Sequence, residues 1–264
     1  MNDKSRLIEK YANALWEATL KNEGIVTPIS DEWPDMTVDD AYDIQMVNIK
    51  RALENGDRIT GKKIGLTSKA MQEMVNVDEP DYGHLLASME VKHGDTISMS
   101  KILQPRVEAE LAFILKEDLV GPKVTVLDVM KATEYIVPSL EIVASRIKDW
   151  KIKLVDTVAD NASSGLYILG DDKFRVDQVD LVQAGMVLYK NGKMVNTGIG
   201  AAALGNPAYC VAWLANRLYE YGVVLKKGEV VLSGALSSAV SAEAGDVVTA
   251  VFSKLGEVSV EFVE

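Results

Sequence analysis

The sequence is poor in the residues that build several common kinds of site. Among its 264 residues are one cysteine, two histidines and only 6% aromatic residues. A single cysteine excludes a disulfide within the chain and favours a reducing compartment. So few histidine and cysteine side chains supply a zinc site poorly. Cys210 lies in an apolar, helix-like run, so we predict a core residue rather than a nucleophile.

Long apolar runs and clusters of positive charge are also missing. No stretch approaches the roughly 18 uninterrupted apolar residues of a membrane span. The first residues mix charged with apolar side chains, unlike a secretory signal peptide, so we expect a cytoplasmic protein. The net charge is −11 and basic residues are scattered, which makes nucleic acid and membranes poor partners. An anionic substrate stays possible if a bound cation offsets the protein's negative field.

The residues that are present predict a globular α+β chain. Hydrophobic residues make up 48% of the sequence, enough for a sizeable core. Residues 1–56 carry apolar side chains at helical spacing, and we expect a helical N-terminal segment there. Residues 57–264 are dominated by short strand-like runs and turns, with a hairpin signal at Asn191-Gly192. This part is expected to form one β-rich body.

The expected elements follow from periodicity and from turn and capping residues. A capping-box pattern at Thr37 and Asp40 marks one helix start, and glycines mark several ends. We expect helices at 7–18, 37–56, 125–135 and 206–221, and strands at 108–115, 136–143, 186–189, 193–197, 230–232, 247–252 and 258–262.

Acidic residues stand in two unusually apolar strands. Glu108 and Glu110 would share one face of their strand, about 7 Å apart, because side chains alternate between faces. Glu141 lies in the second run. Buried like charges are costly unless protons or a cation neutralise them. Three carboxylates on neighbouring strands suit Mg²⁺ or Mn²⁺. The alternative is that Glu108 and Glu110 lie on the solvated face of an edge strand.

Three further segments carry polar groups that could do chemistry. Glycines around two lysines at 61–65 suit close approach to an anion, or a lysine at a strand end between turns. Residues 79–84 read as a turn with an acid and an imidazole, each a candidate general base or simply solvated. Residues 156–165 are rich in small polar groups, as in a binding segment or an ordinary loop. The residues alone leave these alternatives open.

Together these segments resemble the hydratase and decarboxylase branch of the fumarylacetoacetate hydrolase superfamily. The resemblance runs from about residue 41 to the C-terminus. It implies a β-rich body of mixed sheets rolled around the site, in proteins that usually form homo-oligomers. The motifs that carry it are GKKIGLTSKAMQ (61–72), EPDYGHL (79–85), LQPRVEAELAF (103–113), PSLEIVASRIKDW (138–150), VDTVADNASSG (155–165) and VVLSGAL (230–236).

By position, the resemblance implies that Glu108, Glu110 and Glu141 hold a divalent ion, Mg²⁺ or Mn²⁺. Lys63 matches the family's active-site lysine, and Asp81 matches an acid in the PDYG motif of the hydratases. Related decarboxylases tend to have an apolar residue at the position of Asp81. The acid therefore favours water addition over decarboxylation.

The activity that the resemblance implies is addition of water to 2-hydroxypenta-2,4-dienoate, by way of the 2-oxo-3-enoate, giving 4-hydroxy-2-oxopentanoate in meta-cleavage degradation of aromatic compounds. In this hypothesis the ion binds the substrate, Asp81 is the general base and Lys63 balances negative charge. Ser163 and Ser233 are candidates for hydrogen bonds to the substrate. The alternatives are a decarboxylase of 4-oxalocrotonate (2-oxohex-3-enedioate) and a partner subunit in a complex with a decarboxylase or aldolase of the same pathway.

Overall fold

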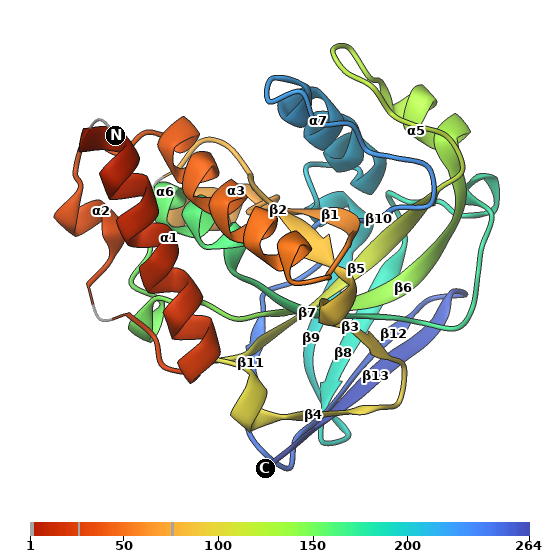
Figure 1. Cartoon of the computed structure of the whole chain (residues 1–264). Helices are drawn as coiled ribbons and strands as arrows, with labels where there is room; N and C mark the ends of the chain where they lie inside the picture. The colour runs from red at the N-terminus through yellow and green to blue at the C-terminus, as the bar shows by residue number, and fades with distance from the viewer. Residues whose placement is uncertain (1–2, 26, 75–76) are drawn as a thin grey trace.

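A computed structural model describes residues 3–25, 27–74 and 77–264. Three helices begin the chain and lie on one side of the molecule, and two further helices, α5 and α7, cover one end of it (Figure 1). The helices are α1 (Asp3–Lys21), α2 (Ile29–Glu32), α3 (Val38–Glu54), α4 (Lys69–Met74), α5 (Val126–Ala132), α6 (Leu154–Ala159) and α7 (Pro207–Tyr219).

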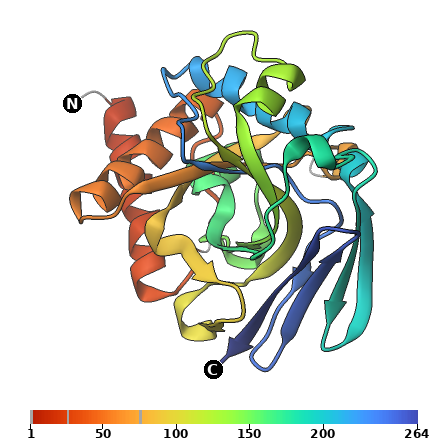
Figure 2. The ribbon, with the colours of Figure 1, turned by 90° about the vertical axis from the view of Figure 1, so that its right-hand side faces the viewer.

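The strands form two sheets. Figure 2 shows the larger sheet curled, with the smaller one standing beside it. The larger sheet has the order β2-β1-β10-β5-β6-β7-β3, with β11 also pairing with β5, and the smaller has the order β4-β13-β12-β8-β9. The strands are β1 (Ile59–Gly65), β2 (Asp81–Leu86), β3 (Glu90–Lys92), β4 (Thr96–Ser98), β5 (Arg106–Leu115), β6 (Thr133–Val143), β7 (Ser164–Leu169), β8 (Gly185–Lys190), β9 (Lys193–Ile199), β10 (Val230–Leu232), β11 (Val240–Ser241), β12 (Val247–Phe252) and β13 (Gly256–Val263).

One large cluster of buried apolar side chains joins the helices to both sheets. It includes Tyr11 from α1, Ile44 from α3, Phe113 from β5, Leu214 from α7 and Phe252 from β12. The N-terminal helices therefore share a core with the β-rich body. A boundary at residue 56 stays a prediction about how the chain is divided. Within the described residues, none of the helices is both long and apolar enough to cross a membrane.

Local signals predicted several elements correctly. The side chain of Thr37 accepts from the Asp40 N–H and the Asp40 carboxylate accepts from the Thr37 N–H, which closes the capping box at the start of α3. Asn191 and Gly192 both have positive φ in the turn between β8 and β9. Cys210 is buried in the core, as expected.

One predicted helix was too long. The helix expected at 125–135 ends at Ala132, and β6 begins at Thr133. Tyr135 is paired with Ile114 on β5, so pairing within the sheet decides the conformation of these last residues. Tertiary context often overrides a local helical pattern in this way.

Candidate metal centre

Glu108, Glu110 and Glu141 meet on one face of the large sheet. Glu108 stands directly opposite Glu141 in the antiparallel pairing of β5 with β6. Glu110 lies two residues further along β5, so its side chain leaves from the same face as that of Glu108. One carboxylate oxygen from each of the three lies within 4.8 Å of the other two. The expected juxtaposition of three acids is therefore present.

The alternative of a solvated edge strand is wrong. β5 lies inside the sheet, between β10 and β6. Glu110 and Glu141 are buried, and only Glu108 is partly exposed. Solvent therefore reaches the cluster at Glu108.

Burial raises the pKa of all three carboxyl groups. Desolvation, with repulsion from Glu141 in second place, raises the pKa of Glu108 to about 7. Desolvation also raises the pKa of Glu110, with the two other glutamates adding to it, and that of Glu141, where Lys63 opposes it. Glu110 Oε1 and Glu141 Oε2 are buried without a hydrogen-bond partner among the described residues. Because such oxygens are costly to bury, the donor set fits a divalent cation that would give them a partner.

The raised pKa of Glu108 predicts how the metal-free protein responds to pH. An ordinary glutamate has a pKa of 4.5, whereas that of Glu108 in the folded chain is about 7. Between these values the folded state binds more protons than the unfolded state, so the free energy of unfolding falls as the pH rises. For this reason, we expect the midpoint temperature of thermal unfolding of metal-stripped protein to decrease as the pH is raised from about 4.5 to about 7. Glu108→Gln is the control and should show a flatter profile. If the midpoint depends on pH in the same way in wild type and in Glu108→Gln, the pKa of Glu108 is not raised.

Lys63 and Asp81 complete the cluster from β1 and β2. Lys63 Nζ lies 3.1 Å from Glu141 Oε1, and both side chains are buried. Burial alone would lower the pKa of Lys63, but Glu141, Asp81 and the other carboxylates raise it above its usual value, which keeps the ammonium charged. Burial raises the pKa of Asp81, and Lys63 opposes that rise. A Cβ atom at Gly65 would collide with the Asp81 carboxylate, so the missing side chain there makes room for the acid.

The segments that carry Lys63 and Asp81 each have a secondary structure that differs from the simplest prediction for that segment. Lys63 lies within β1 rather than at a strand end between turns. The prediction of a turn over residues 79–84 was wrong, because the chain from Asp81 onward forms β2 and pairs with β1. The glycine and the proline in this segment favour a turn, and they obscure the alternation of side chains that is typical of a strand.

Lys62 and His84 are close to Lys63 and Asp81 in the sequence, but the alternation of side chains along the strands keeps them out of the site. Lys62 and His84 point to the opposite face from Lys63 and Asp81. Lys62 Nζ lies 2.8 Å from Glu229 Oε1. His84 Nδ1 lies 2.9 Å from the side chain of Gln45. His84 is therefore not positioned as a general base.

The two predicted serines have partners within the protein. Ser233 Oγ donates to the carbonyl oxygen of Leu111 at 2.7 Å, and Ser163 Oγ lies 3.4 Å from Asp160 Oδ2. The neighbouring Ser164 reaches the cluster instead, with its Oγ 3.5 Å from Glu141 Oε1. Binding of substrate by Ser163 and Ser233 stays a prediction.

Sequence reasoning missed three groups at this site. Ser164 is one, and the backbone N–H of Gly234, which donates to Glu110 Oε2 at 2.8 Å, is another. The third is Arg106, two residues before Glu108 on β5, whose positive charge opposes the rise in the pKa of Glu108. Its position at i−2 from Glu108 was the available signal, because residues two apart on a strand share a face.

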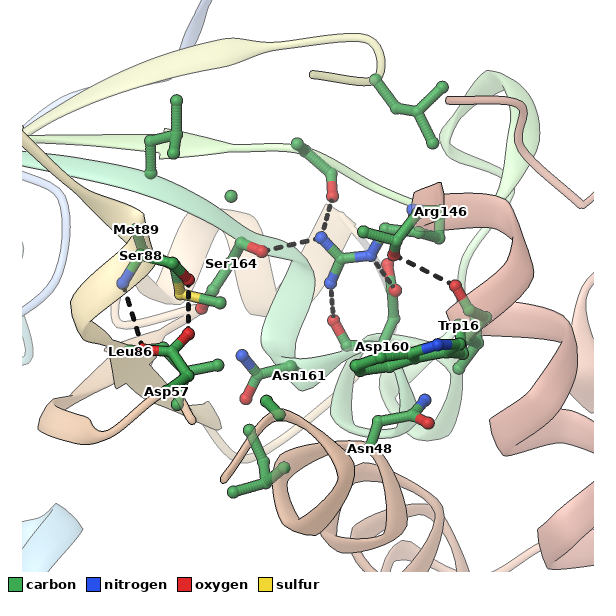
Figure 3. A pocket seen from close by; sticks show the side chains of 18 of the residues that line it. Trp16, Asn48, Asp57, Leu86, Ser88, Met89, Arg146, Asp160, Asn161 and Ser164 are labelled. Atoms are coloured by element: carbon green, nitrogen blue, oxygen red, sulfur yellow. Dashed lines mark hydrogen bonds and ion pairs between the residues drawn. The ribbon is translucent and has the colours of Figure 1, made fainter. Parts of the chain in front are cut away.

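None of the three glutamates lines the large cavity beside the N-terminal helices. It has a volume of about 680 Å³ and lies between α1, α3 and β7. Figure 3 shows Arg146 in this cavity, bonded to Asp160 and to carbonyl oxygens. These partners occupy the guanidinium, so Arg146 is a structural residue. Ser164 lines this cavity and also contacts Glu141 of the carboxylate cluster. Chemistry rather than cavity size therefore identifies the site.

Comparisons with known proteins show which family the chain belongs to. The family model for fumarylacetoacetate (FAA) hydrolase, C-terminal, matches residues 47–263. A 2-hydroxyhexa-2,4-dienoate hydratase of Comamonas testosteroni is 46% identical over the full length of both chains. A 2-hydroxypent-2,4-dienoate hydratase of Pseudomonas putida is 51% identical over 82% of this chain and 98% of its own.

Solved structures add a relative that contains a metal ion. The 4-oxalocrotonate decarboxylase from Pseudomonas putida G7, complexed with magnesium and adipate, superimposes with a TM-score of 0.95. It is 35% identical and covers 100% of this chain and 99% of its own. The same enzyme is also known in complex with calcium and acetate.

Proposed function

The chain belongs to the fumarylacetoacetate hydrolase family, and on that premise we propose that it is a metal-dependent hydratase. It adds water to 2-hydroxypenta-2,4-dienoate, by way of the 2-oxo-3-enoate, and gives 4-hydroxy-2-oxopentanoate in the meta-cleavage degradation of aromatic compounds. The single observation that carries the proposal is the trio of glutamates, two of them buried, with Lys63 and Asp81 beside it. The similarity to dienoate hydratases supports the same substrate class.

A divalent ion, Mg²⁺ or Mn²⁺, would be held by Glu108, Glu110 and Glu141. Carboxylate oxygens are the ligands that such hard ions prefer. The ion would also offset a cluster in which four carboxyl groups, including Asp81, face the ammonium of Lys63. When bound, it supplies Lewis-acid polarisation of a substrate oxygen.

The chain's own residues then have separate tasks. Asp81 accepts a proton from the water molecule whose oxygen bonds to C4 of the 2-oxo-3-enoate. The C3=C4 π bond breaks and its electrons pass to the C2 oxygen as an enolate, and a proton delivered to C3 then restores the 2-oxo group. Lys63, held by Glu141, places a positive charge where negative charge develops on the substrate. Apolar side chains on the same face of the sheet exclude further water and suit the hydrocarbon end of the substrate. They are Leu85, Ala112, Ile114, Val137, Tyr167, Val230 and Leu232.

The proposal is tested by turnover of 2-hydroxypenta-2,4-dienoate, followed as loss of the absorbance of its conjugated system. Metal-stripped protein should be inactive, and Mg²⁺ or Mn²⁺ should restore the rate, because the trio of glutamates cannot polarise the substrate by itself. The six-carbon homologue, assayed beside it, defines the substituent accepted at C5. Full turnover by stripped protein would remove the ion from the mechanism. Failure of every dienoate with every ion would overturn the proposed function.

Decarboxylation is the second candidate, because the fold and the carboxylate trio are also compatible with it. The decarboxylase structure described above matches this chain over its whole length. Hydration releases no CO₂, so a CO₂ assay with 2-oxohex-3-enedioate separates the two reactions. Turnover by the purified chain alone would exclude the role of a partner subunit without activity of its own. Formation of a homo-oligomer, a complex with a decarboxylase or aldolase, and a cytoplasmic location stay predictions.

A further inference from the structure

Within the part of the chain that the structure describes, one edge of the strand that carries Asp81 has no neighbouring strand. β2 is the terminal strand of the larger sheet as described, and its paired edge is bonded to β1. The free edge of a strand presents backbone N–H and C=O groups that need other partners. Because β2 begins at Asp81, whatever holds this edge fixes the backbone from which the Asp81 carboxylate reaches Lys63, Thr157 and the Gly65 N–H.

Two side-chain amides occupy the free edge. Asn161 Oδ1 accepts from the His84 N–H at 2.8 Å, and Asn161 Nδ2 donates to the His84 carbonyl oxygen at 2.9 Å. Gln45 Nε2 donates to the carbonyl oxygen of Tyr82 at 3.1 Å and to that of Val158 at 2.7 Å. Three backbone groups of β2 are thus bonded to α3 and to the turn that follows α6, as they would be to another strand.

The orientation of the Gln45 amide follows from its partners. The carbonyl oxygens of Tyr82 and Val158 can only accept, so the NH₂ group must face them and Oε1 must face away. Gln45 Oε1 lies 2.9 Å from His84 Nδ1, which must therefore carry the ring hydrogen. Burial, together with Lys62, lowers the pKa of His84 to about 3, so the ring stays neutral and this hydrogen bond persists.

The residue types at this contact are those that the geometry requires. Asn161 has a φ of 53°, in the left-handed region that asparagine tolerates better than most residues. A Cβ atom at Gly83 would lie 2.5 Å from the Asn161 carbonyl oxygen. Glycine at position 83 therefore lets the amide of Asn161 approach β2 closely enough to bond on both sides of His84.

We propose that Asn161 and Gln45 are positioning residues for Asp81. By completing the free edge of β2, they hold the Asp81 carboxylate beside Lys63. Both also line the cavity between α1, α3 and β7. This inference rests on the proposed function, in which Asp81 accepts the proton. It makes α3, in the N-terminal segment, part of the machinery that orients the base.

The chain contains a matched control for Asn161. In α7, Asn216 Oδ1 accepts from the Val124 N–H at 2.8 Å, and Asn216 Nδ2 donates to the Val124 carbonyl oxygen at 3.0 Å. Asn161→Ala and Asn216→Ala therefore remove the same pair of hydrogen bonds from two different segments. Only the first of these pairs holds the strand of Asp81.

The test compares kcat, KM and thermal midpoint for the two alanine variants of the full, metal-loaded chain, each also in an Asp81→Asn background. Asn161→Ala should lower kcat about 10- to 100-fold and leave KM and metal affinity within about twofold, because only the base is displaced. In the Asp81→Asn background it should cost no further kcat, since the group that it positions is gone. Asn216→Ala should lower the midpoint comparably and leave kcat within about twofold.

Two variants keep the test decisive if Asn161→Ala does not fold. Gln45→Met keeps the length of the side chain and removes its hydrogen bonds, and it should also lower kcat rather than raise KM. Asn161→Asp keeps the acceptor for the His84 N–H but loses the donor and sets a carboxylate oxygen against the His84 carbonyl oxygen, so it should also lower kcat and leave KM within about twofold.

Three results would overturn the inference. These are equal kcat losses for Asn161→Ala and Asn216→Ala, an undiminished loss in the Asp81→Asn background, or full kcat for Asp81→Asn itself. A wild-type chain that hydrates no dienoate would instead overturn the proposed function, so the two failures are distinguishable.

Discussion

Glu110→Gln will abolish turnover while making the metal-free protein more stable. The substitution keeps the size of the side chain but removes one of three clustered like charges, so repulsion within the cluster falls. The same lost charge weakens binding of the divalent ion. If the ion supplies about 4 kcal/mol of transition-state stabilisation, kcat falls at least about 10³-fold. A glutamate with a merely structural role would lose stability and activity together.

The measurements are turnover of the dienoate and the rise in thermal midpoint on addition of Mg²⁺ or Mn²⁺, which reports binding to the folded state. Glu261→Gln, an exposed acid on β13, is the control and should keep both the rate and the rise. An undiminished rise in Glu110→Gln would show that this residue is not a ligand. Because stability is expected to rise while turnover falls, unfolding of the variant cannot explain the loss of turnover.

Asp81→Asn is expected to slow hydration about 10²- to 10⁴-fold, the usual contribution of a general base. Asparagine keeps the shape of the side chain and cannot accept the proton from water. The ion should still raise the thermal midpoint by the normal amount, because Asp81 is outside the trio of glutamates. Burial raises the pKa of Asp81, and a base acts when ionised, so the wild-type rate should fall on the acid side at a pH above that of an ordinary aspartate.

Kinetics with saturating ion, a pH–rate profile and the metal-dependent midpoint check this expectation. Asp78→Asn, an exposed acid three residues earlier and outside β2, is the control and should keep the wild-type rate. If Asp81→Asn hydrates the dienoate at full rate, Asp81 is not the base. A loss of ion binding equal to that of Glu110→Gln would move Asp81 into the set of metal ligands.

The site shows how far local patterns lead. Glu108 and Glu110 were expected on one face because alternation follows from strand geometry and needs no knowledge of the fold. The same rule could not predict which of the adjacent serines, Ser163 or Ser164, reaches the carboxylates. Ser163 has a left-handed φ of 52° and Ser164 opens β7, so only the backbone decides which hydroxyl reaches Glu141.

Asp81 shows the opposite case. Its segment was expected to be a turn, because glycine and proline are the strongest local signals of turns. Pairing of β2 with β1, and the amides of Gln45 and Asn161 on the other edge, make it a strand instead. These partners are distant in the sequence, so no window around Asp81 contains them.

The sequence by itself determined the features that depend on neighbours a few residues apart. These include the capping box of α3, the turn between β8 and β9 and the shared face of Glu108 and Glu110. The tertiary structure decided which strands are neighbours, and so which charges meet. The register of β5 with β6 sets Glu108 opposite Glu141, and β1 brings the ammonium of Lys63 to Glu141. The physical reason is that a site of buried charges forms between residues far apart in the chain, whose spacing is set by packing of the whole core rather than by any local preference.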